Sequence, residues 1–564
     1  MDSVIKIRDL SYAYRRQENR AALSGVSLTV ERGEFVGIAG RAGSGKSTLC
    51  YALNGLIPHS FGGKMHGEVS VCGINTREVF VPEIARKVGF VLQNAESQLV
   101  GLSVDEDVAF GLENIGLPRE EIKRRVSSAL DAVRLTDFAR RSPWTLSGGQ
   151  KQRLAIAAAM AFEAEVLVLD NPTAELDPVG KLEVMATLAQ LNIERRVTLI
   201  VVNQELEEIV PYASRLVLMD AGRIVKEGSP REVVNDAMMV EGVGVKLPEV
   251  AQVCQKLRER GSWAGALPLT VDEAAAGLAG RTPSRGIETR SQVARPAERL
   301  IEFQNVSFSY LNGTSVLRNV SLTIRRGEFV TLMGPNGAGK TTLAKHFNGL
   351  HVPTSGSVRV GGIDTREATV AQLARTVGYV FQNPDHQLFA RSVEDELSFG
   401  PCNLKWPARR RDESVRRELE KLGGKERAAH DPFFLGMAER KLVAIASVLV
   451  MEPQLLVLDE PATGADHEAA LRIMHYLAEL HRNGLTIVIV THDVSLAAKY
   501  ADRIVVLQSG SIVLDGPPAE VLHHSPELQS SLVTPPQVAQ LAHKLQWPMN
   551  VCSVEAMVEQ LVGK

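Results

Sequence analysis

Four short runs of consecutive apolar residues stand out along the chain. FVGIA (Phe35–Ala39) and FVTLM (Phe329–Met333) each precede a glycine-rich stretch, and VLVLD (Val166–Asp170) and LLVLD (Leu455–Asp459) each end in an aspartate. Unbroken apolar runs of this length are typical of parallel strands that are buried on both faces. The pattern therefore predicts buried strands at the centre of an α/β fold.

Other stretches bear on export and membrane insertion. The first ten residues, MDSVIKIRDL, are charged, alternate as a strand does and contain no apolar signal region. The two most apolar stretches, Ala155–Leu169 and Leu442–Leu458, contain glutamates and lack the roughly 18 uncharged residues that a membrane span needs. We therefore expect neither an export signal nor a membrane span. The protein is expected to be cytoplasmic and to act at a membrane only through a partner.

The chain contains an internal duplication. SLTVERGEFVGIAGRAGSGKSTL (Ser27–Leu49) recurs as SLTIRRGEFVTLMGPNGAGKTTL (Ser321–Leu343), and PEVAQVCQKL (Pro248–Leu257) is echoed by PQVAQLAHKL (Pro536–Leu545). Such repetition predicts two homologous halves, each with a small helical C-terminal extension. The expected segments are a first domain at 1–230 with its extension at 231–275, a linker at 276–298, and a second domain at 299–521 with its extension at 522–564.

Composition narrows the possible partners and the compartment. The 564 residues carry 63 Lys and Arg against 66 Asp and Glu, a net charge of −3, so no nucleic-acid partner is expected. The arginines of the Gly-, Ala- and Pro-rich linker are interpreted as a solvated tether. The five cysteines are far apart, which fits a reducing compartment and favours buried small residues over zinc ligands.

Two glycine-rich segments carry a phosphate-binding motif. GRAGSGKS (Gly40–Ser47) and GPNGAGKT (Gly334–Thr341) both fit G-x4-G-K-[ST], each between an apolar strand and an apolar helix start. The glycines let backbone N–H groups surround phosphates, and the lysine neutralises their charge. The residues predicted to hold ATP are Gly40, Gly43, Gly45, Lys46, Ser47 and Thr48 in the first half and Gly334, Asn336, Gly337, Gly339, Lys340, Thr341 and Thr342 in the second.

A magnesium site is predicted beside each phosphate loop, or P-loop. Asp170 and Asp459 end buried strands at a common distance behind the two P-loops. A carboxylate at the carboxyl end of such a strand can hold the Mg²⁺ shell, which the hydroxyl of Ser47 or Thr341 also reaches.

Between the first P-loop and Asp170 lies LSGGQKQR (Leu146–Arg153), and with it both halves resemble the ATP-binding-cassette (ABC) ATPases. The resemblance implies P-loop NTPase domains, each with a RecA-like core, an antiparallel β subdomain and an α-helical signature subdomain. It also implies that Tyr14 and Tyr310 stack on adenine, although an ordinary strand aromatic explains either one as well. The other implied residues are the Q-loop glutamines Gln93 and Gln382, near Mg²⁺ and the transport partner, and the D-loop aspartates Asp177 and Asp466.

In proteins of this kind each ATP is held between the P-loop of one half and the signature segment of the other. The resemblance therefore assigns γ-phosphate binding to the Ser147 hydroxyl and to the helix N-terminus formed by Gly148, Gly149 and Gln150. Differences between the halves then become informative about each of the two sites.

Three differences distinguish the halves. Asn171 stands where the second half has Glu460, the carboxylate that would polarise the attacking water, and Gln204 stands where the second half has His492, which would contact the γ-phosphate. The signature of the second half is altered to Gly436, Met437, Ala438 and Glu439. Pairing across the halves assigns all three changes to one weakened site, which still binds ATP through Lys46, Ser47 and Asp170.

The other site is complete and is predicted to hydrolyse ATP. It contains Lys340, Thr341, Gln382, Asp459, Glu460 and His492, and it faces the intact segment Ser147–Gln150. Loss of a positioned general base costs about 10²–10⁴-fold in rate.

One stretch narrows the family further. QNPDHQLFARSVEDELSFG (Gln382–Gly400) closely resembles the energy-coupling-factor (ECF) ATPases, which drive uptake of vitamins or transition-metal ions, and Gln93–Gly111 is a looser match. The resemblance implies a transmembrane coupling protein and a solute-binding membrane subunit as partners, a peripheral place on the cytoplasmic face of the membrane, and ATP with Mg²⁺ as cofactors. The solute stays open among vitamins, their precursors, cobalt and nickel.

Two alternatives are weighed against this interpretation. A soluble ABC ATPase of translation or DNA repair usually carries charged arms, zinc modules or coiled-coil insertions, and the sequence contains none of these. A regulatory ATP-binding scaffold without turnover conflicts with the complete set around Glu460 and His492.

Overall fold

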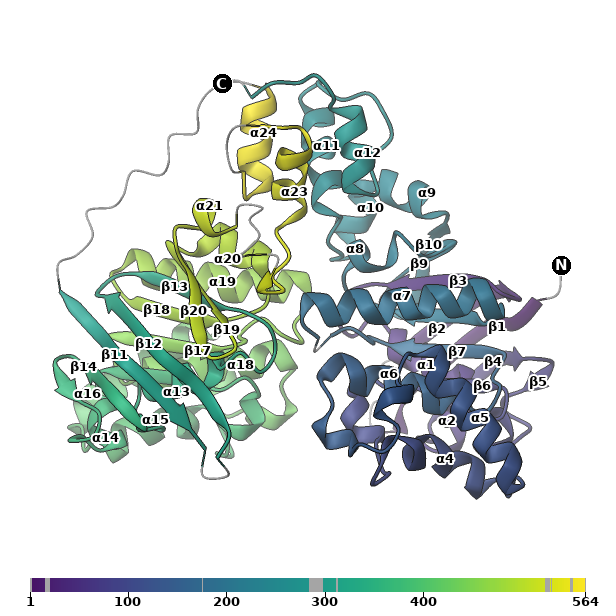
Figure 1. Ribbon diagram of the computed structural model, residues 1–564, viewed down its shortest axis with the longest axis horizontal. Coiled ribbons are helices and arrows are strands. Elements are labelled where there is room, and N and C mark those ends of the chain that lie inside the picture. Colours follow the sequence, from purple (N-terminus) through teal and green to yellow (C-terminus); the bar gives the residue numbers. More distant parts are fainter. Residues whose placement is uncertain are drawn as a thin grey trace. The chain divides into compact units, whose positions relative to one another are not determined.

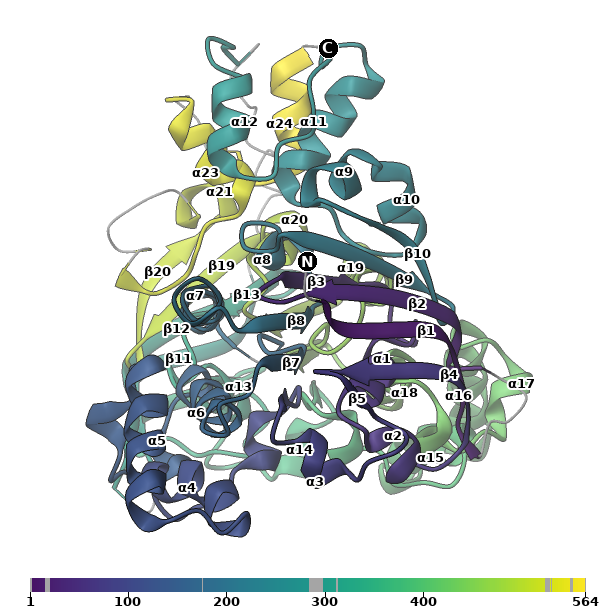
Figure 2. The same cartoon turned by 90° about the vertical axis from the view of Figure 1, so that its right-hand side faces the viewer.

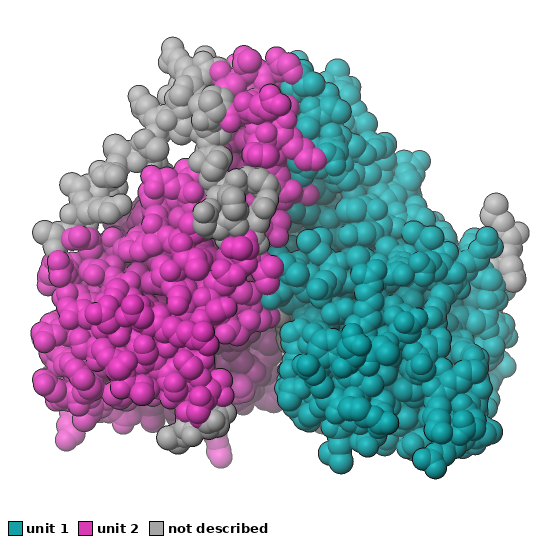
Figure 3. Space-filling model, in the orientation of Figure 1, with its two compact units in different colours: residues 1–279 teal, residues 280–564 magenta. Residues whose placement is uncertain are grey.

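Each half of the chain forms its own unit, Met1–Ala279 and Gly280–Lys564 (Figure 3). The computed structural model describes residues 3–15, 21–174, 176–283, 298–310, 313–522, 528, 530–547 and 551–562. Most of the predicted linker, residues 284–297, therefore lies outside the described residues, including Arg285, Arg290 and Arg295.

Both units contain a small antiparallel sheet. The alternation at the start of the chain is confirmed as a strand, because apolar residues of β1 such as Ile5 and Ile7 are buried while Lys6 and Arg8 are exposed. The strand order is β2-β1-β4-β5 in the first unit and β12-β11-β14-β15 in the second. The strands are β1 (Ser3–Ala13), β2 (Leu23–Glu31), β4 (Lys64–Val71) and β5 (Ile74–Asn75), and β11 (Arg299–Ser309), β12 (Ser315–Arg325), β14 (Ser355–Val360) and β15 (Ile363–Asp364).

A six-stranded sheet forms the centre of each unit, in the order β10-β9-β3-β8-β7-β6 and β16-β17-β18-β13-β19-β20. All pairs are parallel except β9 with β10 and β19 with β20. The four apolar runs are confirmed as strands β3 (Phe35–Ala39), β7 (Val166–Asp170), β13 (Phe329–Met333) and β17 (Leu455–Asp459). The remaining strands are β6 (Val88–Val91), β8 (Thr198–Val202), β9 (Arg215–Asp220), β10 (Arg223–Gly228), β16 (Val377–Val380), β18 (Thr486–Val490), β19 (Arg503–Gln508) and β20 (Ser511–Gly516).

The helices of the first unit gather at its two ends and around the sheets. In both views α4–α6 lie at one end of the unit and α9–α12 at the other, with the sheets between them (Figures 1 and 2). They are α1 (Lys46–Leu53), α2 (Leu56–His59), α3 (Val81–Ile84), α4 (Val104–Asn114), α5 (Arg119–Ala132), α6 (Gly148–Met160), α7 (Pro178–Arg195), α8 (Leu206–Ile209), α9 (Pro230–Asn235), α10 (Ala237–Gly242), α11 (Glu249–Glu259) and α12 (Val271–Gly277).

The second unit repeats this plan with its own helices. The order of elements from the P-loop to the last strand follows that of the first unit, as the duplication predicts. They are α13 (Lys340–His346), α14 (Val370–Leu373), α15 (Val393–Asn403), α16 (Ala408–Lys421), α17 (Lys425–Ala428), α18 (Met437–Leu449), α19 (His467–Arg482), α20 (Val494–Tyr500), α21 (Pro518–Val521), α23 (Gln537–Lys544) and α24 (Val554–Val562). The two echoed segments near the ends of the halves are helices α11 and α23.

Two expectations about single segments have different outcomes. Within the described residues, no helix is long and apolar enough to cross a membrane, as expected. The interpretation of all five cysteines as buried holds for Cys50 and Cys254 and is wrong for the others, because Cys72 and Cys552 are half-buried and Cys402 is exposed on α15. Cys402 lies near the end of an amphipathic helix whose buried positions, such as Val393 and Leu397, fall on the opposite face.

Core strand β17 gives a test of the fold. We expect Leu458→Ala to lower the free energy of unfolding of the second unit by about 2–5 kcal/mol, because the fully buried side chain leaves a cavity between packed elements. Urea denaturation followed by circular dichroism measures the change. The control Val513→Ala, on the exposed side of β20, should change it by less than about 0.5 kcal/mol. Equal losses from the two variants would contradict this placement of the core.

Candidate active site

The two P-loops connect β3 to α1 and β13 to α13, as the motif predicts. The backbone at Gly45 and Gly339, directly before each helix, has φ of 100° and 101°, a conformation that favours glycine. A Cβ atom at Gly45 would also lie 2.6 Å from the carbonyl oxygen of Ala22. Glycine is therefore required here for both the turn and the space, and the loop leads its N–H groups into a helix N-terminus.

The P-loop lysines are buried and directed back over their own loops. Lys46 Nζ donates to the carbonyls of Gly40 and Arg41, both at 2.7 Å. Lys340 Nζ donates to Gly334 and Pro335 at 2.8 and 2.9 Å. Both ammonium groups are thus held where the motif expects phosphate charge, and they are held in the same way in both halves.

In each unit the predicted magnesium-binding aspartate and hydroxyl lie side by side. Ser47 lies close enough to Asp170, and Thr341 to Asp459, to favour the ionised form of each carboxyl group. Burial raises the pKa of both carboxyl groups. Oδ1 of each aspartate is buried without a hydrogen-bond partner among the described residues. A buried carboxylate oxygen without a donor, beside a hydroxyl and a P-loop lysine, fits the oxygen-rich shell that Mg²⁺ requires.

Both candidate adenine-stacking tyrosines lie beside the P-loops. The Tyr14 hydroxyl is 3.1 Å from Thr48 Oγ1, and the Tyr310 hydroxyl is 3.2 Å from Thr342 Oγ1. Each threonine directly follows the predicted magnesium-binding hydroxyl residue. The structure therefore brings these rings to the nucleotide site, while their stacking on adenine stays a prediction.

Glu460 and His492 are joined in the second unit. His492 Nδ1 lies 2.9 Å from Glu460 Oε1, and Thr463 Oγ1 donates to Glu460 Oε2 at 2.9 Å. The neighbouring His492 holds the pKa of Glu460 below its usual value despite burial. The backbone of Glu460 is left-handed, with φ of 50°, which is strained for a glutamate. This conformation places the Glu460 carboxylate directly after Asp459, the predicted magnesium ligand.

The first unit has a different network at this place. Asn171 has the same left-handed backbone, φ 48°, which asparagine adopts more easily than glutamate. Asn203 Nδ2 donates to Thr173 Oγ1 at 3.0 Å and to Glu208 Oε2 at 2.7 Å, and Lys181 Nζ lies 2.6 Å from Glu208 Oε1. Gln204 is half-buried next to Asn203.

Sequence comparison missed this network. Its four side chains align with Ala462, Ala470, Thr491 and Leu496 of the second half, and only the first half has the charged pair. The lone signal in the sequence was a lysine and a glutamate at positions where the other half has apolar residues.

The signature segments differ as predicted, and the structure adds a packing reason. The Ser147 hydroxyl accepts from Gln150 N at 3.3 Å, and Gln150 Oε1 accepts from Ser147 N at 3.0 Å, so the pair caps α6. A Cβ at Gly149 would lie 3.2 Å from the Gly180 backbone, so this glycine also permits close packing of α6 on α7. In the second unit Gly436 offers no capping hydroxyl, and Glu439 is paired with Arg427 at 2.7 Å.

The Q-loop glutamines Gln93 and Gln382 are exposed, two residues beyond the ends of β6 and β16. The sequence analysis missed a second glutamine in each segment that supports this loop. Gln98 accepts from Leu92 N at 2.8 Å and donates to Phe90 O at 3.2 Å. Gln387 donates to Ala444 O at 2.8 Å and so anchors the loop on α18.

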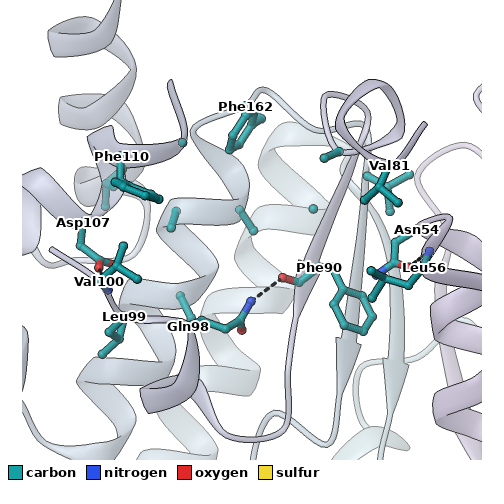
Figure 4. Close-up of a pocket in the computed structure, with 18 residues that line it drawn as sticks. Asn54, Leu56, Val81, Phe90, Gln98, Leu99, Val100, Asp107, Phe110 and Phe162 are labelled. Carbon is teal, nitrogen blue, oxygen red and sulfur yellow. Dashed lines mark hydrogen bonds between the residues drawn. The ribbon is translucent and has the colours of Figure 1, made fainter. Parts of the chain in front are cut away.

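An apolar groove of about 280 Å³ opens beside the first Q-loop. Strand β6, helices α2, α3, α4 and α6 and the segment after the Q-loop line it, with Phe110 and Val100 to one side and Phe90, Leu56 and Val81 to the other (Figure 4). Phe110 and Val100 are 49% and 59% exposed, so the groove presents apolar side chains to solvent.

Comparison with known proteins identifies the family. The model of the ABC transporter family matches residues 23–174 and 317–463. An ABC transporter ATP-binding protein of Caldanaerobacter subterraneus subsp. tengcongensis is 39% identical, over 99% of this chain and 98% of that protein. The chain belongs to the ABC transporter family. An ABC transporter ATP-binding protein of Methanosarcina mazei is 38% identical over 96% of this chain and 93% of its own length.

Among solved structures, CbiO1 of Clostridium perfringens, part of the ABC transporter complex CbiONQ, is 33% identical with a TM-score of 0.39. It covers 44% of this chain and 99% of its own. The family match confirms the two ABC domains and the α/β fold class. This protein is an ABC ATPase that uses ATP and Mg²⁺.

The two halves of this ABC ATPase differ in the chemistry that they can perform. Glu460 can accept a proton from a water molecule, and its partners His492 and Thr463 hold both carboxylate oxygens in place. Asn171 has a neutral amide that cannot accept this proton. Both halves have the P-loop and the strand-terminal aspartate that are predicted to bind phosphate and magnesium.

The unequal halves give a direct kinetic test. We expect Glu460→Gln to lower the steady-state ATPase rate of the purified chain by about 10²–10⁴-fold, because the general base is lost. Asn171→Glu should restore little activity to the first half, because Gln204 still replaces the histidine there. Phosphate release at saturating ATP measures the ATPase rate of both variants. A near wild-type rate in Glu460→Gln would contradict the assignment.

Proposed function

We propose that this ABC ATPase is the energy-coupling subunit of an ECF-type importer, acting on the cytoplasmic face of the membrane. One observation carries the proposal: the segment with the closest resemblance to ECF ATPases also forms an exposed apolar surface beside the Q-loop. The residues that carry the resemblance therefore lie at a surface able to receive a partner.

Buried carboxylates fix this surface in each half. Asp107 on α4 accepts from the backbone N–H groups of Val100 and Gly101 at 2.7 and 2.8 Å. Glu396 on α15 accepts in the same way from Phe389 and Ala390 at 3.0 and 2.8 Å. Each carboxylate is at most 5% exposed. The loops that present Val100 and Phe389 are therefore held in shape before any partner binds, which lowers the cost of docking.

The two halves offer different apolar side chains at this surface. In the second half Phe389 and Phe399 meet edge to face with ring centroids 4.6 Å apart, and both are about half exposed. In the first half the aligned residues are Val100 and Phe110. Exposed aromatic residues gathered at one place are typical of a contact surface for another protein. We assign this surface to helices of a transmembrane coupling protein.

ATP hydrolysis would then take place on the P-loop of the second half. The residues predicted for this site in the second half are Lys340, Thr341, Gln382, Asp459, Glu460 and His492, of which Glu460 and His492 are in direct contact. We propose that the first half binds a second ATP through Lys46, Ser47 and Asp170 and turns it over slowly. The assignment of the altered signature Gly436–Glu439 to this slow site rests on the family resemblance.

A separate membrane subunit would select the solute, which we propose to be a vitamin, a vitamin precursor, or a cobalt or nickel ion. The competing function is a soluble ABC ATPase of translation or DNA repair. The two functions differ in the partner that the apolar surface receives. A transporter subunit would bind a membrane protein there, and a soluble ATPase would bind a ribosome or nucleic acid.

Co-purification tests the transporter assignment. The chain, tagged and expressed in its own host, should be recovered from detergent-solubilised membranes together with a small polytopic protein. Phe110→Asp combined with Phe399→Asp should reduce the recovered membrane protein at least about tenfold, because the charges make the buried contact unfavourable.

The matched control is Ile193→Asp, on the outer face of α7, where an apolar side chain is 77% exposed. It should leave the recovery unchanged, and thermal melts should show all variants folded. Recovery of the chain with ribosomes or nucleic acid and without any membrane protein would favour the soluble alternative.

A further inference from the structure

A lysine of the second unit is buried next to the predicted general base. Lys441, on the first turns of α18, is 5% exposed. Its Nζ donates to the backbone carbonyl of Glu460 at 3.0 Å and to that of Thr463 at 2.6 Å. One ammonium group therefore binds both ends of the four-residue turn that carries Glu460.

The cost of this burial indicates that the contact is specific. Burial lowers the pKa of Lys441 to about 8, with the charge of Glu460 acting in the opposite direction. A buried ammonium group is tolerated where carbonyl oxygens replace its lost water. Here the two carbonyls belong to the turn itself, so Lys441 connects the signature helix to that turn.

The turn needs such a connection. Glu460 has a left-handed backbone, which is strained for this residue and must be held by its surroundings. The side chain of Thr463 in turn donates to Glu460 Oε2 at 2.9 Å. Fixing the carbonyls of both residues therefore fixes the relative position of the carboxylate and its hydroxyl donor.

The first unit lacks this connection. Gln152 aligns with Lys441 on the equivalent helix α6, and its Nε2 is buried without a hydrogen-bond partner among the described residues. The corresponding turn carries Asn171, which takes up the left-handed backbone more easily than Glu460. The lysine is thus present in the half that has the carboxylate.

We propose that Lys441 is a positioning residue for ATP hydrolysis, which holds the Glu460–Thr463 turn so that the Glu460 carboxylate faces the attacking water. The inference rests on the proposed role of Glu460 as the general base. Among the residues that the structure describes, Lys441 forms no hydrogen bond with Lys340 or with Asp459. It should therefore affect the chemical step more than ATP binding.

Kinetics of Lys441 variants test the proposal. We expect Lys441→Met to lower kcat by about 10–100-fold, because a displacement of about 1 Å in a catalytic group can have this effect. KM for ATP should change less than about threefold, since the P-loop contacts are intact. Lys441→Arg, which retains the donor, should recover kcat to within about threefold of wild type. The control Lys425→Met, at an exposed lysine of α17 outside the site, should stay within about twofold.

A double variant separates this proposal from the assignment of Glu460. If Lys441 acts through Glu460, then Lys441→Met should cause almost no further loss in the Glu460→Gln background. If Lys441→Met keeps the wild-type kcat while Glu460→Gln is inactive, the proposed role of Lys441 is overturned and that of Glu460 is not. A full additional loss in the double variant, or a loss that Lys441→Arg does not restore, would also overturn it. If Lys441→Met does not fold, Lys441→Gln takes its place with the same thresholds.

Discussion

The placement of a strand-terminal aspartate beside a P-loop hydroxyl defines each site. Asp170 lies beside Ser47, and Asp459 beside Thr341, so the end of a central strand meets the start of the phosphate-binding helix. Strand pairing then places the next residue, because Asp459 lies opposite Val490 and Glu460 N donates to Val490 O at 2.9 Å. His492 follows Val490 by two residues, and so the register of two parallel strands brings the carboxylate and the imidazole together.

The same scaffold accommodates two different sets of polar groups next to the strand-terminal aspartate. In the second half they surround the carboxylate of Glu460, whereas in the first half Glu208 supplies a carboxylate from α8 that binds Thr173, Asn203 and Lys181. A buried polar group must find a partner, and each half satisfies this requirement differently. In the first half this network stabilises the fold around Asn171. In the second half the strained backbone is kept at Glu460, the predicted general base.

The surface beside the Q-loop follows from a similar constraint. Asp107 and Glu396 are buried because they satisfy backbone N–H groups that would otherwise lack partners, and these bonds turn Val100 and Phe389 outward. Buried hydrogen bonds to a carboxylate thus determine which apolar side chains reach solvent. The site and this surface belong to one unit, since Gln387 anchors the same segment on the signature helix α18.

The sequence alone determined the duplication, the four core strands, both P-loops and the inequality of Glu460 and Asn171, because these depend on local patterns and on residues in register. It could not reveal Lys441 or the Glu208 network. Apart from Asn203, which is five positions from Glu208, their partners lie 19 to 35 positions away, and neither fits a motif. Only the tertiary structure decides which buried donor reaches which carbonyl, since that choice depends on how helices pack on the ends of strands. The same holds for the exposed groove, whose side chains come from several separate elements and loops.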